Sequence, residues 1–189
     1  MGIIKIPSEV DFKFKTYIAL FDRALESKNH MLLKKLLKLI KENESLFLDS
    51  YSKRKKEGLY YTNEEISTFI ISKSIIEIIN KSINYFRNSK IGIKDFKDIN
   101  LLESTVKREI IEILFNLTIC DPTCGSGVFL LSAANILFEL IQKLSKSVDP
   151  VEIKTRILRN IYGLDINPYA VKLCSLKLIA WFYKGVELN

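Results

Sequence analysis

The residues best suited to chemistry lie in one short stretch, Asp121-Pro-Thr-Cys-Gly-Ser-Gly127. Gly125 and Gly127 can adopt positive φ angles and bring the backbone close to a ligand. No Gly-Lys-Ser/Thr follows, so the stretch is not a P-loop, and it lacks the third glycine of the dinucleotide fingerprint. The pattern therefore indicates a ligand-binding turn and disfavours a nicotinamide-dependent oxidoreductase.

The residues on either side of this turn predict the elements that hold it. Residues 117–120 are compatible with a short buried β-strand, which Asp121-Pro122 ends. Ser126 is placed to cap an apolar helix that runs from Val128 to Leu144. A strand, a glycine turn and a helix in this order direct free N–H groups and the helix dipole at a ligand above the strand end.

A second carboxylate lies downstream, at the end of Asn160-Ile-Tyr-Gly-Leu-Asp165. This hexapeptide predicts another short strand. An acidic residue at the end of the second strand of a Rossmann-like sheet bonds the ribose hydroxyls of a nucleoside cofactor. Asp165 lies 44 positions after Asp121, farther than is usual, and an inserted helix around 151–159 accounts for the excess.

Three motifs carry a resemblance to a known family. Asp121-Pro-Thr-Cys-Gly-Ser-Gly-Val-Phe-Leu130 resembles the cofactor motif of S-adenosylmethionine-dependent DNA adenine-N6 methyltransferases, namely type I modification subunits and fused type II restriction–modification enzymes. Ile161-Tyr-Gly-Leu-Asp-Ile-Asn-Pro-Tyr-Ala170 resembles their second motif. Gly58-Leu-Tyr-Tyr-Thr-Asn63 resembles the Gly-x-Tyr-Thr-Pro element that precedes the core, with Asn63 where proline is usual. The motifs stand in the family's order over about residues 54–182.

The resemblance implies a binding site for S-adenosylmethionine. In that scheme the turn after Asp121 shapes the methionine pocket, Tyr61 and Thr62 border its methionine end, Asp165 binds the ribose and Ile166 lies beside the adenine ring. The implied cofactor residues are Tyr61, Thr62, Asp121, Thr123, Gly125, Ser126, Gly127, Asp165 and Ile166.

The resemblance also implies a catalytic motif, Asn/Asp-Pro-Pro-Tyr/Phe, which holds the flipped adenine. Asn167-Pro168-Tyr169 is similar to it but follows Asp165 by two residues, which is the wrong strand end. The simpler interpretation is that Asn167 caps a final helix over 170–182, with Pro168 in its first position. We therefore assign no catalytic residue, and we expect the catalytic motif and a target-recognition domain to lie beyond Asn189.

Most of the chain upstream of the turn predicts helices. Two helices between Ser8 and about Ser50 form an N-terminal arm. The second has leucines on one face and lysines on the other over residues 31–40, which is typical of a solvated helix packed on its own domain. Thr62-Asn-Glu-Glu65 is a capping box, and it opens an amphipathic helix through Ile66, Phe69, Ile70 and Ile76.

The segments between these helices and the turn complete the pattern. Residues 88–98 predict a loop, and 101–114 predict a helix that leads into the first strand. Asp149 is the expected cap of the inserted helix, with Pro150 in its first position.

Basic residues cluster in Ser52-Lys-Arg-Lys-Lys56, just before the Tyr-Thr element. The whole chain carries 29 Lys and Arg against 22 Asp and Glu, a net charge of +7, which fits a polyanionic partner. If this cluster meets DNA, Lys53, Arg54, Lys55 and Lys56 contact backbone phosphates and read no sequence. A solvated surface is the alternative for these four residues.

Composition limits the remaining classes. The 189 residues are 48% hydrophobic, which suits one globular domain with a sizeable core. Cys120, Cys124, Cys174 and the single His30 show no zinc spacing and no disulfide framework, so we expect no metal and a reducing cytoplasm. We find no signal peptide and no run that spans a membrane.

We therefore predict an α/β fold, with a helical arm over 1–57 and the first, helix-rich part of a Rossmann-like class I methyltransferase core over 58–189. The predicted function is the cofactor-binding segment of a DNA adenine-N6 methyltransferase, with S-adenosylmethionine as cofactor and DNA as partner. It is inactive alone and completed by a further half or a specificity subunit. An S-adenosylmethionine-binding remnant or split half, or a nucleic-acid or scaffold module without the ligand, are the alternatives. The resemblance implies a central first strand, so its free edge predicts a homo-oligomer or a docked chain.

Overall fold

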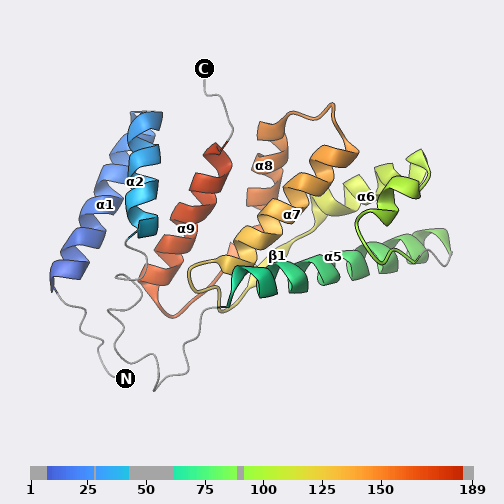
Figure 1. The fold of residues 1–189 in the computed structure, drawn as a ribbon, viewed down its shortest axis with the longest axis horizontal. Helices are drawn as coiled ribbons and strands as arrows, with labels where there is room; N and C mark the ends of the chain where they lie inside the picture. The colour runs from blue at the N-terminus through green and yellow to red at the C-terminus, as the bar shows by residue number, and fades with distance from the viewer. Residues whose placement is uncertain (1–7, 28, 43–61, 89–91, 185–189) are drawn as a thin grey trace.

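The computed structural model describes residues 8–27, 29–42, 62–88 and 92–184, which Figure 1 shows as a ribbon. Its elements in chain order are α1 (Ser8–Glu26), α2 (His30–Glu42), α5 (Glu64–Arg87), the 3-10 turn η1 (Asp98–Leu101), α6 (Ser104–Asn116), β1 (Ile119–Asp121), α7 (Val128–Leu144), α8 (Pro150–Arg159), β2 (Ile161–Gly163) and α9 (Pro168–Tyr183). This helix-rich arrangement with a small sheet agrees with the expected α/β class.

The two strands form a parallel pair, as the two motifs predict. Ile119, Cys120 and Asp121 lie opposite Ile161, Tyr162 and Gly163, and α7 and α8 make the crossover between them. Ile119 and Ile161 pack towards the helices, whereas Cys120 and Tyr162 are exposed. Because alternate residues of a strand face opposite sides, one face of this sheet is covered and the other is open.

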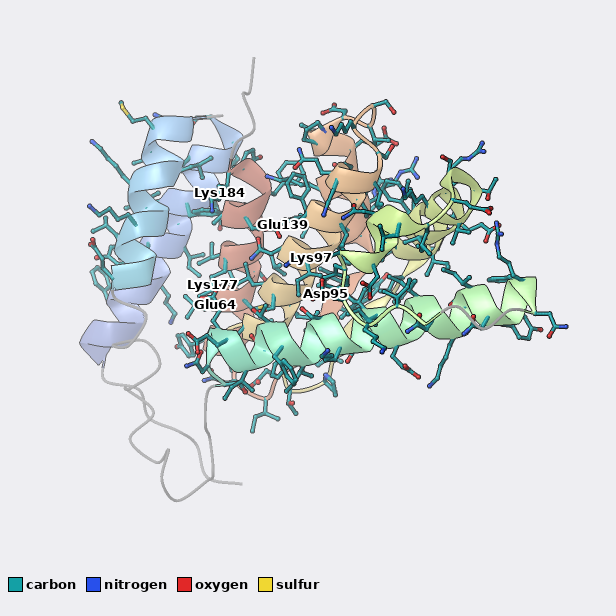
Figure 2. The ribbon with its side chains drawn as sticks, turned by 45° about the vertical axis from the view of Figure 1, so that its right-hand side comes forward. Glu64, Asp95, Lys97, Glu139, Lys177 and Lys184 are labelled. Carbon is teal, nitrogen blue, oxygen red and sulfur yellow. The ribbon has the colours of Figure 1, made fainter. Side chains whose placement is uncertain are left out.

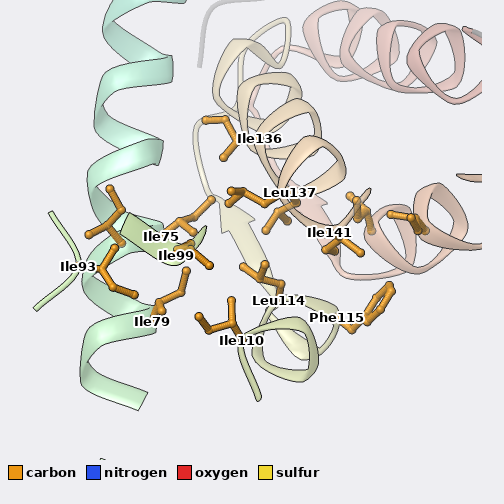
Figure 3. Packing of buried hydrophobic residues seen from close by; sticks show 14 of the residues in the cluster. Ile75, Ile79, Ile93, Ile99, Ile110, Leu114, Phe115, Ile136, Leu137 and Ile141 are labelled. Carbon is orange, nitrogen blue, oxygen red and sulfur yellow. The ribbon is translucent and has the colours of Figure 1, made fainter. Parts of the chain in front are cut away.

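The main core lies between α5, α6 and α7, with β1 beside it. α5 contributes Ile75, Ile76, Ile79 and Ile83, and α7 contributes a nearly continuous apolar surface. Figure 3 shows Ile75 and Ile79 of α5 beside Ile93 and Ile99, with Ile110 and Leu114 of α6 and Leu137 of α7 in the same cluster. A helix that is apolar on most sides needs such cover, and α7 has neighbours in α5, α6, α8 and α9.

The buried face of α5 differs from the expected one. Ile66, Phe69 and Ile70 are 54%, 63% and 44% exposed, whereas Ser67 is fully buried. Its hydroxyl lies 2.8 Å from that of Ser132 on α7, and this polar pair lets the two helices approach closely. Of the residues predicted for the buried face, Ile76 is buried and the other three are not, because a buried serine gives no hydrophobic signal.

α9 is packed on two sides. Leu173 and Leu176 contact the arm through Phe21, Leu33 and Leu36, which confirms that α2 packs on its own domain. On the other side, Trp181 is 7% exposed, and its indole N–H donates to Asn135 Oδ1 at 2.8 Å. We expected one side of this helix to be uncovered around Trp181, which is wrong, because α7 supplies both an apolar wall and a partner for the indole.

The residues that cap α5, α8 and α9 can be compared with the caps predicted from the sequence. Asp149 caps α8 and Asn167 caps α9, each followed by proline, as predicted. At α5 the capping box is wrong by one residue: Asn63 Oδ1 accepts the N–H of Glu65 at 2.8 Å, and the helix begins at Glu64. Asn and Thr both cap well, so the sequence alone does not choose between them.

Two predictions fall outside the described residues, namely Tyr61 in the cofactor set and the phosphate contacts of Lys53, Arg54, Lys55 and Lys56. Among the helices that are described, none is both long and apolar enough to cross a bilayer.

Candidate functional site

The glycine turn links β1 to α7 through two left-handed residues. Gly125 has φ 52° and Gly127 has φ 85°, and the N–H of Gly127 donates to the carbonyl of Cys124 at 2.8 Å. Both angles lie in the region that glycine adopts without a steric cost. The turn therefore has the backbone shape that the two glycines predict.

Ser126 does not cap α7, so that prediction is wrong. The N-cap is Gly127, without a side-chain hydrogen bond, and Ser126 is 5% exposed. Its hydroxyl instead accepts from Lys177 Nζ at 3.1 Å. The left-handed Gly127 turns the chain after Ser126, so the serine side chain points towards α9 rather than along the axis of α7.

Lys177 is a site residue that the sequence analysis missed. It projects from α9 (Figure 2) and reaches a turn 51 positions earlier in the chain. The available signal is a lysine in a mostly apolar helix, since a half-buried cation needs a polar partner, but the helix also contains Lys172 and the pattern does not distinguish the two.

The carboxylate of Asp165 joins the second motif to the first. Its Oδ2 accepts the N–H of Gly125 at 2.8 Å, and its Oδ1 accepts the N–H of Asn167, also at 2.8 Å. The backbone reinforces this contact, because Leu164 donates to the carbonyl of Asp121 at 2.9 Å and accepts from the N–H of Cys124 at 2.8 Å. The two residues after β2 are thus hydrogen-bonded to the first half of the turn, from Asp121 to Gly125.

Most of the predicted cofactor residues lie together at this end of the sheet. Asp121 Oδ1 accepts the N–H of Thr123 at 3.0 Å, which shapes the start of the turn. Ile166 is 87% exposed beside Asp165, so its apolar side chain is available to a flat ligand. Thr62 lies two residues before α5 and is half-buried, and the pairing of Ser67 with Ser132 holds that end of α5 against the first turn of α7.

Two thiols fill the space beneath the turn. Cys124 and Cys174 are each 4% exposed and cluster with Leu130. Burial, followed by the neighbouring Cys124, raises the pKa of the Cys174 thiol to about 12, and burial also raises the pKa of Cys124. Both groups are therefore neutral at physiological pH and act as packing residues.

Two glycines lie close above these thiols, and the fit is tighter at Gly127 than at Gly163. A Cβ added to Gly127 would lie 2.3 Å from Cys174 Sγ, and one added to Gly163 would lie 3.0 Å from Cys124 Sγ. The sequence predicts that a glycine at 127 lets the backbone come close to a ligand. In the structure Gly127 also lies against Cys174 of α9, which leaves no room for a side chain.

Other kinds of site are not supported in the part of the chain that the structure describes. No three His, Cys, Asp or Glu side chains lie close enough there to hold a metal ion. An open groove of about 450 Å³ lies between α8 and α9, and none of its lining residues belongs to the predicted cofactor set: Thr155, Leu158, Arg159, Ile179, Phe182 and Tyr183.

Comparison with known proteins identifies the family of this segment. Residues 93–186, which include both motifs, match the family described as the MmeI DNA-methyltransferase domain. A putative type II restriction enzyme and methyltransferase of Methanocaldococcus jannaschii is 31% identical over 137 residues. The adenine-specific methyltransferase PglX of Streptomyces coelicolor is 31% identical over 86 residues. This segment of the chain belongs to the DNA adenine methyltransferase family.

The shared segment is small in relation to these family members. It covers 64% and 45% of this chain, but 12% of the archaeal relative and 7% of PglX. No solved structure shows significant similarity to the chain. Family membership therefore concerns the segment around the turn and Asp165, and the activity of a whole protein is a separate question.

Proposed function

We propose that the chain is the S-adenosylmethionine-binding segment of a DNA adenine-N6 methyltransferase of a restriction–modification system. The observation that carries this proposal is the contact between the Gly125 N–H and the Asp165 carboxylate, 40 positions apart in the sequence. It brings the methionine-pocket motif and the ribose motif together at the end of one parallel strand pair. We also propose that β1 and β2 are two strands of a Rossmann-like class I sheet.

The residues present fit the chemical parts of that cofactor. The Asp165 carboxylate would accept from the ribose hydroxyls, and the exposed side chain of Ile166 would lie against the adenine ring. The turn from Asp121 to Gly127, including Thr123, would surround the methionine part, with Tyr61 and Thr62 at its outer end. When bound, S-adenosylmethionine supplies a methyl group on a sulfonium.

The 189 residues contain no Asn/Asp-Pro-Pro-Tyr/Phe sequence. Asn167 is 6% exposed, and its Oδ1 accepts from the N–H groups of Tyr169 and Ala170. That side chain is occupied as a helix cap and is not free to hold an adenine. We therefore propose that this polypeptide binds the cofactor without transferring the methyl group, and that another polypeptide segment supplies the catalytic motif.

DNA is the proposed partner of the complete enzyme, and the basic cluster Lys53, Arg54, Lys55 and Lys56 is its proposed phosphate contact. A non-catalytic S-adenosylmethionine-binding scaffold is the second candidate, because it requires the same site and no catalytic motif. Methyl transfer to DNA after addition of a polypeptide that carries the motif separates the two.

Titration calorimetry with S-adenosylhomocysteine and with NAD tests the proposal. We expect weak, saturable binding of S-adenosylhomocysteine and none of NAD. Asp165→Ala should weaken binding about 10–150-fold, because it removes charge-assisted hydrogen bonds worth about 1.5–3 kcal/mol. Equal binding by wild type and variant would exclude the ribose assignment, and absence of binding by the wild type would exclude the proposed function for this chain.

A further inference from the structure

The Asp165 carboxylate accepts two backbone hydrogen bonds. Each of its two oxygens accepts one backbone N–H at 2.8 Å, from Gly125 and from Asn167. An ionised carboxylate offers about four acceptor positions, so two remain. Two is the number that the 2′ and 3′ hydroxyls of a ribose require as donors. Ribose binding and the two backbone contacts are therefore compatible on the same side chain.

The contact with Asp165 holds the N–H of Gly125, whose carbonyl accepts the weaker S–H donor of Cys124 at 3.6 Å. Gly125 has no side chain to pack, and it stands at φ 52° in the left-handed region. Glycine loses more conformational freedom on ordering than any other residue. A hydrogen bond to an ionised acceptor is about twice as strong as a neutral one, which makes Asp165 an effective constraint on this peptide.

The contact with Asn167 extends the network to α9. Asn167 donates its N–H to Asp165 and uses its own Oδ1 to cap α9, by accepting from Tyr169 and Ala170. α9 in turn places Lys177 against Ser126 on the far side of the turn. The turn is thus held from both ends by the segment that begins at Asp165.

We infer that Asp165 is a positioning residue for the glycine turn as well as the proposed ribose ligand. Its carboxylate fixes the Gly125 peptide before a ligand arrives, and the same carboxylate would transmit ribose binding to the turn that surrounds the methionine part. The ribose component of this inference rests on the proposed function. The positioning component concerns the free protein and stands without it.

Two substitutions remove these contacts to different extents. Asp165→Ala removes both acceptors. Asp165→Asn keeps one oxygen but turns an NH2 group towards one of the two N–H donors, so one contact is lost together with the charge. Asp149→Asn is the matched control, because Asp149 also accepts a backbone N–H two residues onward, from Val151 at 3.0 Å, but lies beyond the other end of α7.

The first measurement uses the free 189-residue protein. Amide proton exchange and the proton chemical shift of Gly125 are followed by NMR in the wild type and the three variants. We expect exchange at Gly125 to accelerate at least about tenfold in Asp165→Ala, with an upfield shift, and to change in the same direction in Asp165→Asn. Asp149→Asn should leave Gly125 unchanged. A Gly125 amide that is the same in wild type and Asp165→Ala would overturn the inference.

The second measurement compares S-adenosylhomocysteine with its 2′,3′-dideoxy analogue, which has no ribose hydroxyls. If Asp165 also positions the turn, Asp165→Ala loses about 5–10-fold in affinity for the dideoxy analogue and more for the parent compound. An unchanged affinity for the analogue would limit Asp165 to the ribose and overturn the positioning role in binding. If the wild type binds neither compound, the proposed function fails, and the Gly125 measurement still decides the positioning role.

Discussion

At the scale of single residues, the turn depends on the absence of a side chain at Gly127. This residue combines φ 85° with a space that Cys174 already fills. An alanine there would suffer both the left-handed backbone penalty and a collision with the thiol 2.3 Å from its Cβ. The two costs have different origins and can be separated by changing Cys174.

We predict that Gly127→Ala lowers the free energy of unfolding by about 2–5 kcal/mol. In a Cys174→Ala background the same change should cost less, because the collision with Sγ is relieved while the backbone penalty remains. Urea denaturation of the four proteins measures both values. Gly92→Ala is the control, since its added Cβ meets nothing within 4 Å. An equal cost of Gly127→Ala in both backgrounds would contradict the proposed steric conflict.

The buried thiol of Cys174 predicts a dependence of stability on pH. Burial raises its pKa from 9.0 to about 12, so folding favours the neutral form. The sign follows from proton binding: the stabilisation is complete below pH 9 and is lost as the pH rises towards 12. Between these values the stability of wild type should fall more steeply than that of Cys174→Ala, as measured by urea denaturation at successive pH values. Parallel curves would show that Cys174 does not contribute.

The roles of single side chains could be predicted from the sequence where the partners are the backbone N–H groups of the next few residues. Asp149 and Asn167 each precede a proline, and both cap as predicted. The prediction failed where two candidates stood side by side, as with Thr62 and Asn63, and where the true partner was remote, as with Ser126 and Lys177. A contact across 51 positions depends on how α9 packs, which no local pattern contains.

At the scale of elements, the C-terminal end of α9 is held by a buried lysine. Lys154 of α8 is 4% exposed, and its Nζ donates to the carbonyls of Trp181, Phe182 and Lys184. It also lies 5.0 Å from the ring centre of Phe138 and 5.3 Å from that of Trp181. The last carbonyls of a helix have no partner within it, and here a neighbouring helix satisfies them. Burial lowers the pKa of this ammonium.

We predict that Lys154→Met lowers the free energy of unfolding by about 1–3 kcal/mol, because it removes the Nζ donor from the carbonyls of Phe182 and Lys184 while keeping most of the side-chain volume. The carbonyl of Trp181 loses the same donor but keeps the N–H of Lys184 at 3.3 Å. Trp181 is the single tryptophan of the chain, so its fluorescence reports the local change during urea denaturation. Lys146→Met, at an exposed position, is the control. A loss no larger than that of the control would show that the three carbonyl contacts add nothing to stability.

The sequence predicted the spans of the helices better than their faces. α7 covers Val128–Leu144 as predicted, and α8 and α9 agree within two residues at each end. On α5 the apolar residues occur nearly all round the helix, so periodicity did not identify the buried side. That choice was made by tertiary packing, in which Ser67 and Ser132 meet and Ile66, Phe69 and Ile70 face outwards.

At the scale of the whole molecule, the two-stranded sheet of the described residues has an exposed face and an edge that pairs with no described strand. In the described part of the chain β1 pairs with β2 alone, and the face of Cys120 and Tyr162 is exposed. Leu164 and Ile166 continue this exposed apolar surface, at 59% and 87% exposure. An edge with unpaired N–H and C=O groups beside apolar side chains favours association with another chain.

We predict that the 189-residue polypeptide self-associates and transfers no methyl group to adenine-containing DNA by itself. Sedimentation velocity at several concentrations tests the first statement, with Tyr162→Lys as the variant that should shift the distribution towards monomer. Transfer of a radiolabelled methyl group, with and without a polypeptide that carries Asn/Asp-Pro-Pro-Tyr/Phe, tests the second. A stable monomer that methylates DNA unaided would place catalytic residues within this chain, and Asn167-Pro168-Tyr169 would then be the first candidate.

The position at which S-adenosylhomocysteine binds tests the proposed cofactor site most directly, and titration into the 15N-labelled chain followed by NMR can locate it. The predicted result is a saturable change in the amide signals of residues 121–127 and 165–167, with little change in α1 and α2. A ligand that perturbs the groove between α8 and α9 instead, or that leaves all signals unchanged, would contradict the assignment of the glycine turn and Asp165 as the cofactor site.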